Sequence, residues 1–177
     1  GQYGSGIVRM AQHATKRHGV ELGRTETQLV HVAAAQDAAA EARALRRYTP
    51  AGIILFDTLF DYSVEDEVAE GLRKLGLDPA TIRYAVVTHP HPDHHGGAKF
   101  LQERYGTRIV MSAADWDVID RLPGTKPSRD VVATDGQLLT LGDTSVRLHI
   151  TPGHTPGTVS MVFQVKDLAM LEQVKPG

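Results

Sequence analysis

The chain has 177 residues, of which 41% are hydrophobic and 23% are charged, and its formal net charge is −2. This composition predicts one globular domain with a buried core, and it gives no charge excess that would favour nucleic acid or a membrane surface as a partner. The absence of cysteine excludes disulfides and thiolate metal ligands, so any bound metal must be held by nitrogen and oxygen.

The first 48 residues differ in character from the rest. Residues 25–48 are rich in strong helix formers, with Thr25 as a plausible N-cap, and predict one long helix. Residues 1–24 show no sustained periodicity and predict a loop. We therefore expect an N-terminal helical segment of unknown role over residues 1–48, a main domain over 49–165 and a tail over 166–177.

Residues 53–121 alternate between short apolar runs and helical patterns. The runs predict buried strands at 53–58, 84–88 and 107–111. The helical patterns cover 64–75, 97–105 and a segment after Ser112, and the expected N-caps are Ser63, paired with Asp66, and Ser112, paired with Asp115. This alternation predicts a sheet covered by helices, so the fold class is α/β (α+β).

Beyond Pro127 the apolar residues recur at every second position. Two turn signals, Asp135-Gly136 and Gly142-Asp143, interrupt this pattern and predict antiparallel hairpins. No apolar run is long enough to span a membrane, and the first residues contain no signal-peptide core. These observations leave the compartment and the oligomeric state undetermined.

The stretch "THPHPDHHGG" at 88–97 concentrates possible metal ligands. In an extended segment, side chains two positions apart point the same way, so His89 and His91 can bind one ion together. Asp93 and His94 follow as the chain turns into a helix, which aims them at a neighbouring position. The prolines at 90 and 92 stiffen the loop, and the glycines at 96 and 97 permit a tight helix entry beside the site.

A second stretch, "TPGHTPG" at 151–157, places His154 between two Pro-Gly turns directly after a predicted strand. It supplies a third nitrogen ligand. The alternatives are a solvated loop rich in imidazole and a purely structural zinc site, although structural sites usually have four protein ligands and often use cysteine. We expect His95 to lie behind the ligands or face solvent, and His149 to be a hydrogen-bonded structural residue.

These two motifs, preceded by "GIILFDT" at 52–58, resemble the metallo-β-lactamase-fold hydrolase superfamily over about residues 52–165. The resemblance implies a partial metallo-β-lactamase αβ/βα sandwich with one or two Zn2+ ions at the loop edge of its sheets. His89, His91 and His154 resemble the ligands of the first zinc, and Asp93 and His94 resemble ligands of the second. Asp57 resembles the acidic residue that packs beside the site in this family.

The implied activity is zinc-dependent hydrolysis of a small-molecule substrate. Three neutral imidazoles leave one tetrahedral position open, where bound water has a pKa near 7 and supplies hydroxide at neutral pH. This hydroxide would attack an ester, thioester, lactone or β-lactam carbonyl, while Asp93 orients it and relays its proton.

The chain also departs from the family pattern. A helical segment stands where the family has strand hairpins, and the only acidic residue near a suitable spacing for the last second-zinc ligand is Asp167. Residues 160–177 also resemble periplasmic copper- and silver-binding efflux chaperones, although Met161 stands alone where those proteins have a Met-x-Met pair. A truncated domain or composite chain that binds metal without catalysis is therefore the alternative expectation.

Overall fold

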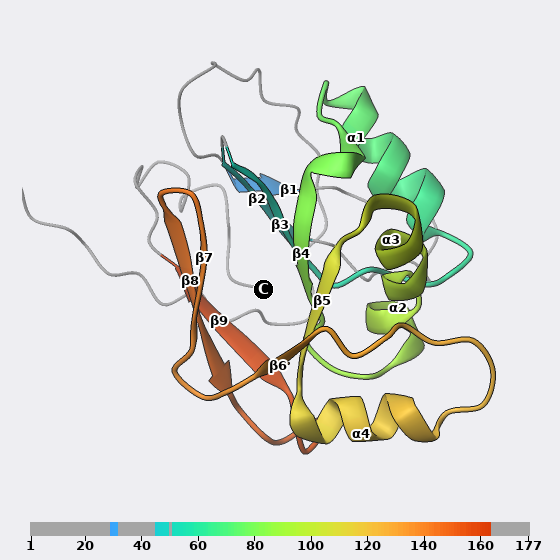
Figure 1. Cartoon of the computed structure of the whole chain (residues 1–177), viewed down its shortest axis with the longest axis vertical. Coiled ribbons are helices and arrows are strands. Elements are labelled where there is room, and N and C mark those ends of the chain that lie inside the picture. Colours follow the sequence, from blue (N-terminus) through green and yellow to red (C-terminus); the bar gives the residue numbers. More distant parts are fainter. Residues whose placement is uncertain (1–28, 32–44, 50, 164–177) are drawn as a thin grey trace, which may run out of the picture.

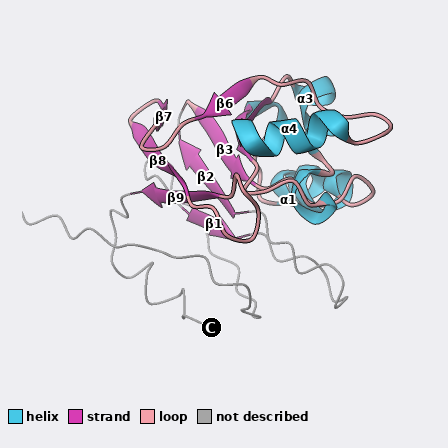
Figure 2. Cartoon of the chain, turned by 90° about the horizontal axis from the view of Figure 1, so that it is seen from below, coloured by secondary structure: helices cyan, strands magenta, loops and turns pink. Residues whose placement is uncertain are grey.

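The computed structural model describes residues 29–31, 45–49 and 51–163. In this part of the chain, a six-stranded sheet lies between a layer of helices and a three-stranded sheet (Figures 1 and 2). None of the helices in these ranges is long and apolar enough to cross a membrane. The layered arrangement of helices and sheets agrees with the fold class expected from the sequence.

The large sheet follows the chain order β1-β2-β3-β4-β5-β6. Its first three strands are antiparallel: β1 (Leu29–His31), β2 (Leu45–Thr49) and β3 (Gly52–Phe56). From β3 onward the neighbours are parallel, through β4 (Ile82–Val86), β5 (Arg108–Ser112) and β6 (Val131–Ala133). Because parallel strands end at the same edge of a sheet, the loops after β3, β4 and β5 lie together.

The helices connect the parallel strands. A π-helical turn at Val64–Ala69 continues as α1 (Glu70–Lys74), and a 3-10 turn at Pro79–Thr81 leads into β4. Between β4 and β5 lie α2 (Pro92–His95) and α3 (Ala98–Tyr105), and α4 (Ala113–Arg121) follows β5. The small antiparallel sheet consists of β7 (Leu138–Leu141), β8 (Thr144–Ile150) and β9 (Val159–Phe163).

Strand β3 separates two apolar cores, as its continuous apolar sequence predicts. Ile53 and Leu55 pack with the helical layer, which includes the wholly buried Trp116. Ile54 and Phe56 face the small sheet, where the Phe56 and Phe163 rings stack with centroids 6.2 Å apart. Because both faces of β3 are buried, packing against the helical layer on one side and the small sheet on the other fixes the carboxyl end of this strand.

The long helix expected over 25–48 is wrong in both described parts of that segment, which are strands. β2 pairs with β3 from Leu45↔Phe56 to Thr49↔Gly52. Pairing with a buried strand outweighs the helix propensity of the local sequence. Two antiparallel strands, β1 and β2, therefore precede β3 at the position where the sequence predicted a helical segment. Residues 1–28, 32–44, 50 and 164–177, including Asp167 and the whole tail, lie outside the described residues, and the domain division at residue 49 stays a prediction.

Two smaller expectations also need correction. Ser63 occupies the N-cap position, but its side chain makes no capping hydrogen bond; instead its hydroxyl donates to the carbonyl of Phe60 at 3.4 Å. The Asp135-Gly136 turn joins β6 of the large sheet to β7 of the small sheet rather than closing a hairpin, whereas Gly142-Asp143 does join the paired strands β7 and β8. The predicted cap at Ser112 is confirmed, since its Oγ accepts from the Asp115 backbone N–H at 3.2 Å.

Candidate metal centre

The histidines lie where two loops meet. Thr88–His94 follows β4, and the loop from Thr151 to Thr158 connects β8 to β9, at the lower end of the sheets in Figure 1. The backbone N–H of Val159 donates to the Thr88 carbonyl at 2.8 Å, which joins the small sheet to the loop after β4. The loop after β4 and the loop that carries His154 are therefore neighbours in the fold, although they lie far apart in the sequence.

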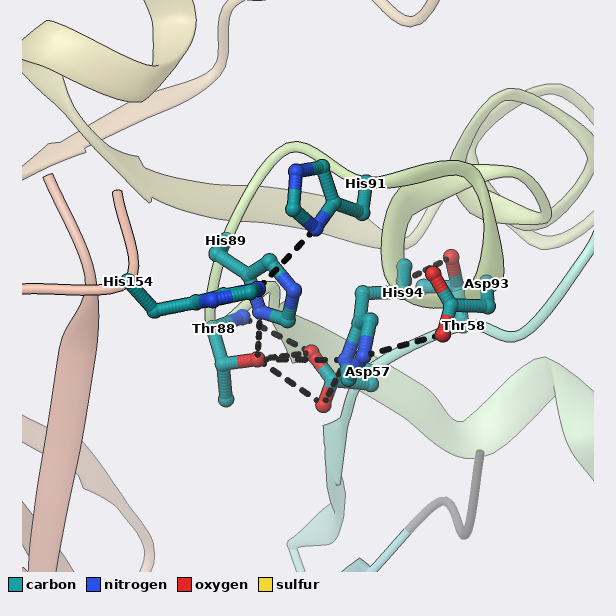
Figure 3. Close-up of polar contacts among 8 residues, drawn as sticks. All are labelled: Asp57, Thr58, Thr88, His89, His91, Asp93, His94 and His154. Atoms are coloured by element: carbon teal, nitrogen blue, oxygen red, sulfur yellow. Dashed lines mark hydrogen bonds and ion pairs between the residues drawn. The ribbon is translucent and has the colours of Figure 1, made fainter. Parts of the chain in front are cut away.

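Three imidazoles converge at this junction. One ligand atom each from His89, His91 and His154 can be chosen so that all lie within 4.8 Å of one another. His154 Nε2 and His91 Nδ1 are 3.1 Å apart (Figure 3), close to the roughly 3.3 Å that separates two nitrogens bound to one tetrahedral zinc. His89 is buried, whereas His91 and His154 are exposed. The cluster is thus closed on the protein side and open to solvent.

A buried carboxylate, Asp57, lies directly behind the cluster. It follows β3 with a φ of 61°, a left-handed conformation whose strain costs about 1–2 kcal/mol for a residue with a side chain. Its carboxylate accepts hydrogen bonds from the Thr88 backbone N–H at 2.7 Å, from the Thr88 hydroxyl at 2.9 Å and from His94 Nδ1 at 2.8 Å. The strained corner therefore fixes the loop that carries the histidines.

This network sets the tautomers of two histidines. The Thr88 hydroxyl has one proton and donates it to Asp57, so it accepts from His89 Nδ1 at 3.1 Å, and the lone pair of His89 is on Nε2. In the same way, His94 Nδ1 donates to Asp57, and His94 Nε2 lies 3.3 Å from the Asp93 carboxylate. Such hydrogen bonds commonly orient metal-binding imidazoles.

The same surroundings shift the pKa values of these two histidines in opposite directions. Burial, together with the nearby His94, lowers the pKa of His89 to about 4. Burial also acts to lower the pKa of His94, but the hydrogen bond and the charge of Asp57, aided by Asp93, outweigh it and raise that pKa. At neutral pH His89 is therefore neutral, the form in which imidazole binds metal.

Acidification is expected to destabilise the metal-free protein through His89. Below pH 6.5 the unfolded chain binds a proton at this residue that the folded chain excludes, so the contribution is full above pH 6.5 and is lost as the pH falls to about 4. That difference in pKa is worth about 3 kcal/mol. Urea unfolding of chelator-treated protein at pH 7 and pH 4 should show a smaller loss in the His89→Gln variant; equal losses would contradict the assignment.

The structure brings together the residues that the sequence paired. His89 and His91 meet His154, and the side chains of Asp93 and His94 face each other. His149 lies outside the cluster, and its Nδ1 is 3.3 Å from Asp135. His95 is half-buried, and its Nε2 is buried without a hydrogen-bond partner in the described part of the chain.

The two glycines after the cluster act differently from the expectation. A Cβ at Gly97 would lie 2.3 Å from the Thr58 carbonyl oxygen, and one at Gly96 would lie 2.7 Å from the Asp61 backbone nitrogen. The close approach is therefore between α2 and the loop after β3, rather than at the metal-binding cluster. Sequence reasoning also missed Thr88, because a threonine at a strand end carries no signal of its own.

Comparison with known sequences points to one family. The profile of the metallo-beta-lactamase superfamily matches residues 45–170. A hydroxyacylglutathione hydrolase of Acidiphilium cryptum (strain JF-5) is 40% identical over 80 residues, which cover 45% of this chain and 30% of that protein. A hydroxyacylglutathione hydrolase of Methylococcus capsulatus is 35% identical over 104 residues, covering 59% of this chain and 37% of that protein.

Solved structures give the same result. A subclass B3 metallo-beta-lactamase of Bradyrhizobium japonicum has a TM-score of 0.70 and 27% identity, covering 82% of this chain and 57% of its own. A metallo-beta-lactamase of Cronobacter sakazakii has a TM-score of 0.63 and 31% identity, covering 68% of this chain and 52% of its own. The chain thus spans less than half of these two sequence relatives and little more than half of the two structures. Because the family profile covers most of the chain and the fold agrees, this chain belongs to the metallo-beta-lactamase superfamily.

Proposed function

We propose that this chain provides the metal centre of a zinc-dependent hydrolase that cleaves an ester, thioester, lactone or β-lactam carbonyl. The observation that carries the proposal is the convergence of His89, His91 and His154 from two separate loops, with ligand atoms within 4.8 Å. In this proposal these three residues hold the first zinc, and Asp93 and His94 contribute to a second site.

The donor set fits zinc. All three side chains are imidazoles, and the chain contains no cysteine that could supply a thiolate. Two of the imidazoles face solvent, which leaves space for a substrate at a fourth position. A zinc ion bound in such an open site lowers the pKa of water to about 7 and polarises a carbonyl oxygen.

The remaining chemistry belongs to the chain's own carboxylates. The Asp93 side chain is 41% exposed, so a substrate and a water molecule can reach it. Its carboxylate would orient the attacking water, accept a proton from it at Oδ2 and return that proton to the leaving group. Asp57 would hold His94 in place through Nδ1, since their hydrogen bond leaves His94 Nε2 facing Asp93.

The names of the relatives suggest which substrates to try first. The two sequence relatives are called hydroxyacylglutathione hydrolases, and the two solved structures are metallo-beta-lactamases. A hydroxyacylglutathione thioester and a β-lactam are therefore the first probes, followed by a lactone and an aryl ester.

The test combines metal content with turnover. The purified chain is loaded with zinc, its metal content per chain is measured, and hydrolysis of the four probes is followed before and after chelation. We expect about one to two zinc ions per chain and turnover of at least one probe that chelation abolishes. Zinc bound at full stoichiometry without turnover of any probe would instead support a metal-binding but inactive chain.

The substitution Asp57→Asn is expected to weaken the second site. Asparagine tolerates a positive φ, so the backbone at this corner is preserved while the negative charge behind His94 is lost. Loss of such an outer partner typically lowers metal affinity about 10- to 100-fold. Titration with Co2+, read from its absorption spectrum, should show weaker binding of the second equivalent; an unchanged second equivalent would argue against this role for Asp57.

A further inference from the structure

Asp115, in the first turn of α4, is a charged residue with no exposed surface. Its backbone N–H donates to Ser112 Oγ at 3.2 Å, as expected of a helix cap. The carboxylate turns to the loop between β8 and β9, where it accepts from the Thr155 hydroxyl at 3.2 Å and from the Gly157 backbone N–H at 3.1 Å. Two of its donors thus come from the loop that carries His154.

The loop is seated directly on the start of α4. A Cβ added at Gly157 would lie 2.0 Å from Ser112 Oγ and 2.6 Å from Asp115 Cγ, so no side chain fits between loop and helix. The Thr155 backbone N–H also donates to Thr158 Oγ1 at 3.0 Å, which closes the loop on itself. The turn after His154 is therefore held by a short set of contacts centred on one carboxylate.

The ring of His154 packs against the rings of two other candidate ligands, His89 and His91, with centroids 4.7 and 4.8 Å away. It is exposed, and the hydrogen-bond partner of its ring is another candidate ligand, His91. Its position then depends on the backbone that follows it, at Thr155 and Gly157. His89, by contrast, is buried and held through Thr88, so the two loops use different means to place their histidines.

Burying the carboxylate of Asp115 costs free energy, which its hydrogen bonds must offset. Burial raises the pKa of Asp115, although the hydrogen bonds from Thr155 and Gly157, the charge of His91 and the Ser112 hydroxyl act in the opposite direction. Hydrogen bonds to a carboxylate are roughly twice as strong as those between neutral groups. A charged acceptor therefore holds the two loop donors more firmly than a neutral amide would.

We propose that Asp115 is a positioning residue for the metal centre: it anchors residues 155–157 so that His154 meets His89 and His91. Within the described residues, the hydrogen bonds of its carboxylate go to Thr155 and Gly157 of the loop rather than to a candidate ligand, although its charge also acts on His91. The inference rests on the proposed metal site, but it concerns metal affinity rather than hydrolysis, so its test does not depend on turnover.

The test is a thermodynamic cycle with Asp115→Asn and His154→Ala. Zinc affinity is measured by competition with a chromophoric chelator in the unsubstituted chain, both single variants and the double variant. We expect Asp115→Asn to weaken the first site about 10- to 100-fold, as outer partners of metal ligands do. In the His154→Ala background, the same substitution should change the remaining affinity far less, because only the charge that Asp115 exerts on His91 is then lost. An equal loss in both backgrounds, or no loss in either, would overturn the proposal.

Two substitutions at Thr155 test the same contact from the loop side, in case the Asp115→Asn variant fails to fold. Thr155→Val removes the hydroxyl that donates to Asp115 and should weaken zinc binding, whereas Thr155→Ser keeps the hydroxyl and should restore it. Asp117→Asn serves as a control because Asp117 lies on an exposed part of α4, paired with Arg129. Equal affinities for Val and Ser would contradict the proposal, as would failure of the unsubstituted chain to bind zinc. Zinc binding without turnover would contradict the proposed hydrolysis alone.

Discussion

Replacing His91 by Ala is expected to empty the first zinc site and to abolish hydrolysis. His91 Nδ1 lies 3.1 Å from His154 Nε2, so its removal leaves two imidazoles where three converge. Structural zinc sites with four ligands bind with about 10–16 kcal/mol, or roughly 3 kcal/mol per ligand, which corresponds to about a hundredfold in affinity. Zinc per chain after dialysis, together with turnover of the best probe, measures both effects.

The variant should remain folded. His91 is exposed and its side chain makes no capping hydrogen bond to α2, so its loss leaves neither a cavity nor an unsatisfied group. Exposed substitutions of this kind usually change stability by about 0.5 kcal/mol or less. His149→Ala is the matched control, because His149 is a partly exposed histidine paired with Asp135 outside the cluster. Normal zinc content in His91→Ala would remove His91 from the site.

Replacing Asp93 by Ala is expected to separate metal binding from catalysis. The three clustered imidazoles are untouched, so zinc at the first site should stay. The proposed base is lost, and removal of a positioned general base usually lowers the rate by about 10²–10⁴-fold. The measurement is kcat on the best probe alongside the zinc content of the same sample.

Asp117→Ala is the control for this prediction. Its carboxylate is also exposed and forms an ion pair, with Arg129, but it lies on α4 rather than beside the histidines. A surface ion pair of this kind contributes about 0–1 kcal/mol, so turnover should be unaffected. If Asp93→Ala kept full turnover, the carboxylate would have no role in proton transfer.

The sequence predicts the fold correctly where the hydrophobic pattern of a segment depends only on the burial of that segment. β3 is buried on both faces, and its continuous apolar sequence predicts this burial. The sequence at 45–49 predicts a helix because its neighbours favour helix, whereas its pairing with β3 is a long-range contact that local propensity does not contain. The prediction of a hairpin at Asp135-Gly136 is wrong for a similar reason, since no local signal tells whether a turn joins strands of one sheet or of two.

The sequence predicts the pairing of candidate ligands that lie close to one another in the chain. His89, His91, Asp93 and His94 lie within six positions, and extended and helical geometry separate them into pairs. The contacts that hold these histidines in place are long-range: the resemblance marked Asp57, but no pattern in the sequence marked Thr88 or the loop contact of Asp115. Asp57 and Thr88 act through contacts across 31 positions, and Asp115 reaches Thr155 across 40 positions. The sequence marked Asp115 only as a helix cap, because its contacts with the His154 loop depend on how the two sheets pack.

The most direct test of the central claim is a crystal structure of the zinc-loaded protein with its zinc content measured on the same preparation. The account predicts one ion bound by His89, His91 and His154, with each nitrogen at about 2.0–2.1 Å. Zinc located elsewhere, or a His154 imidazole that does not coordinate the ion shared by His89 and His91, would contradict it.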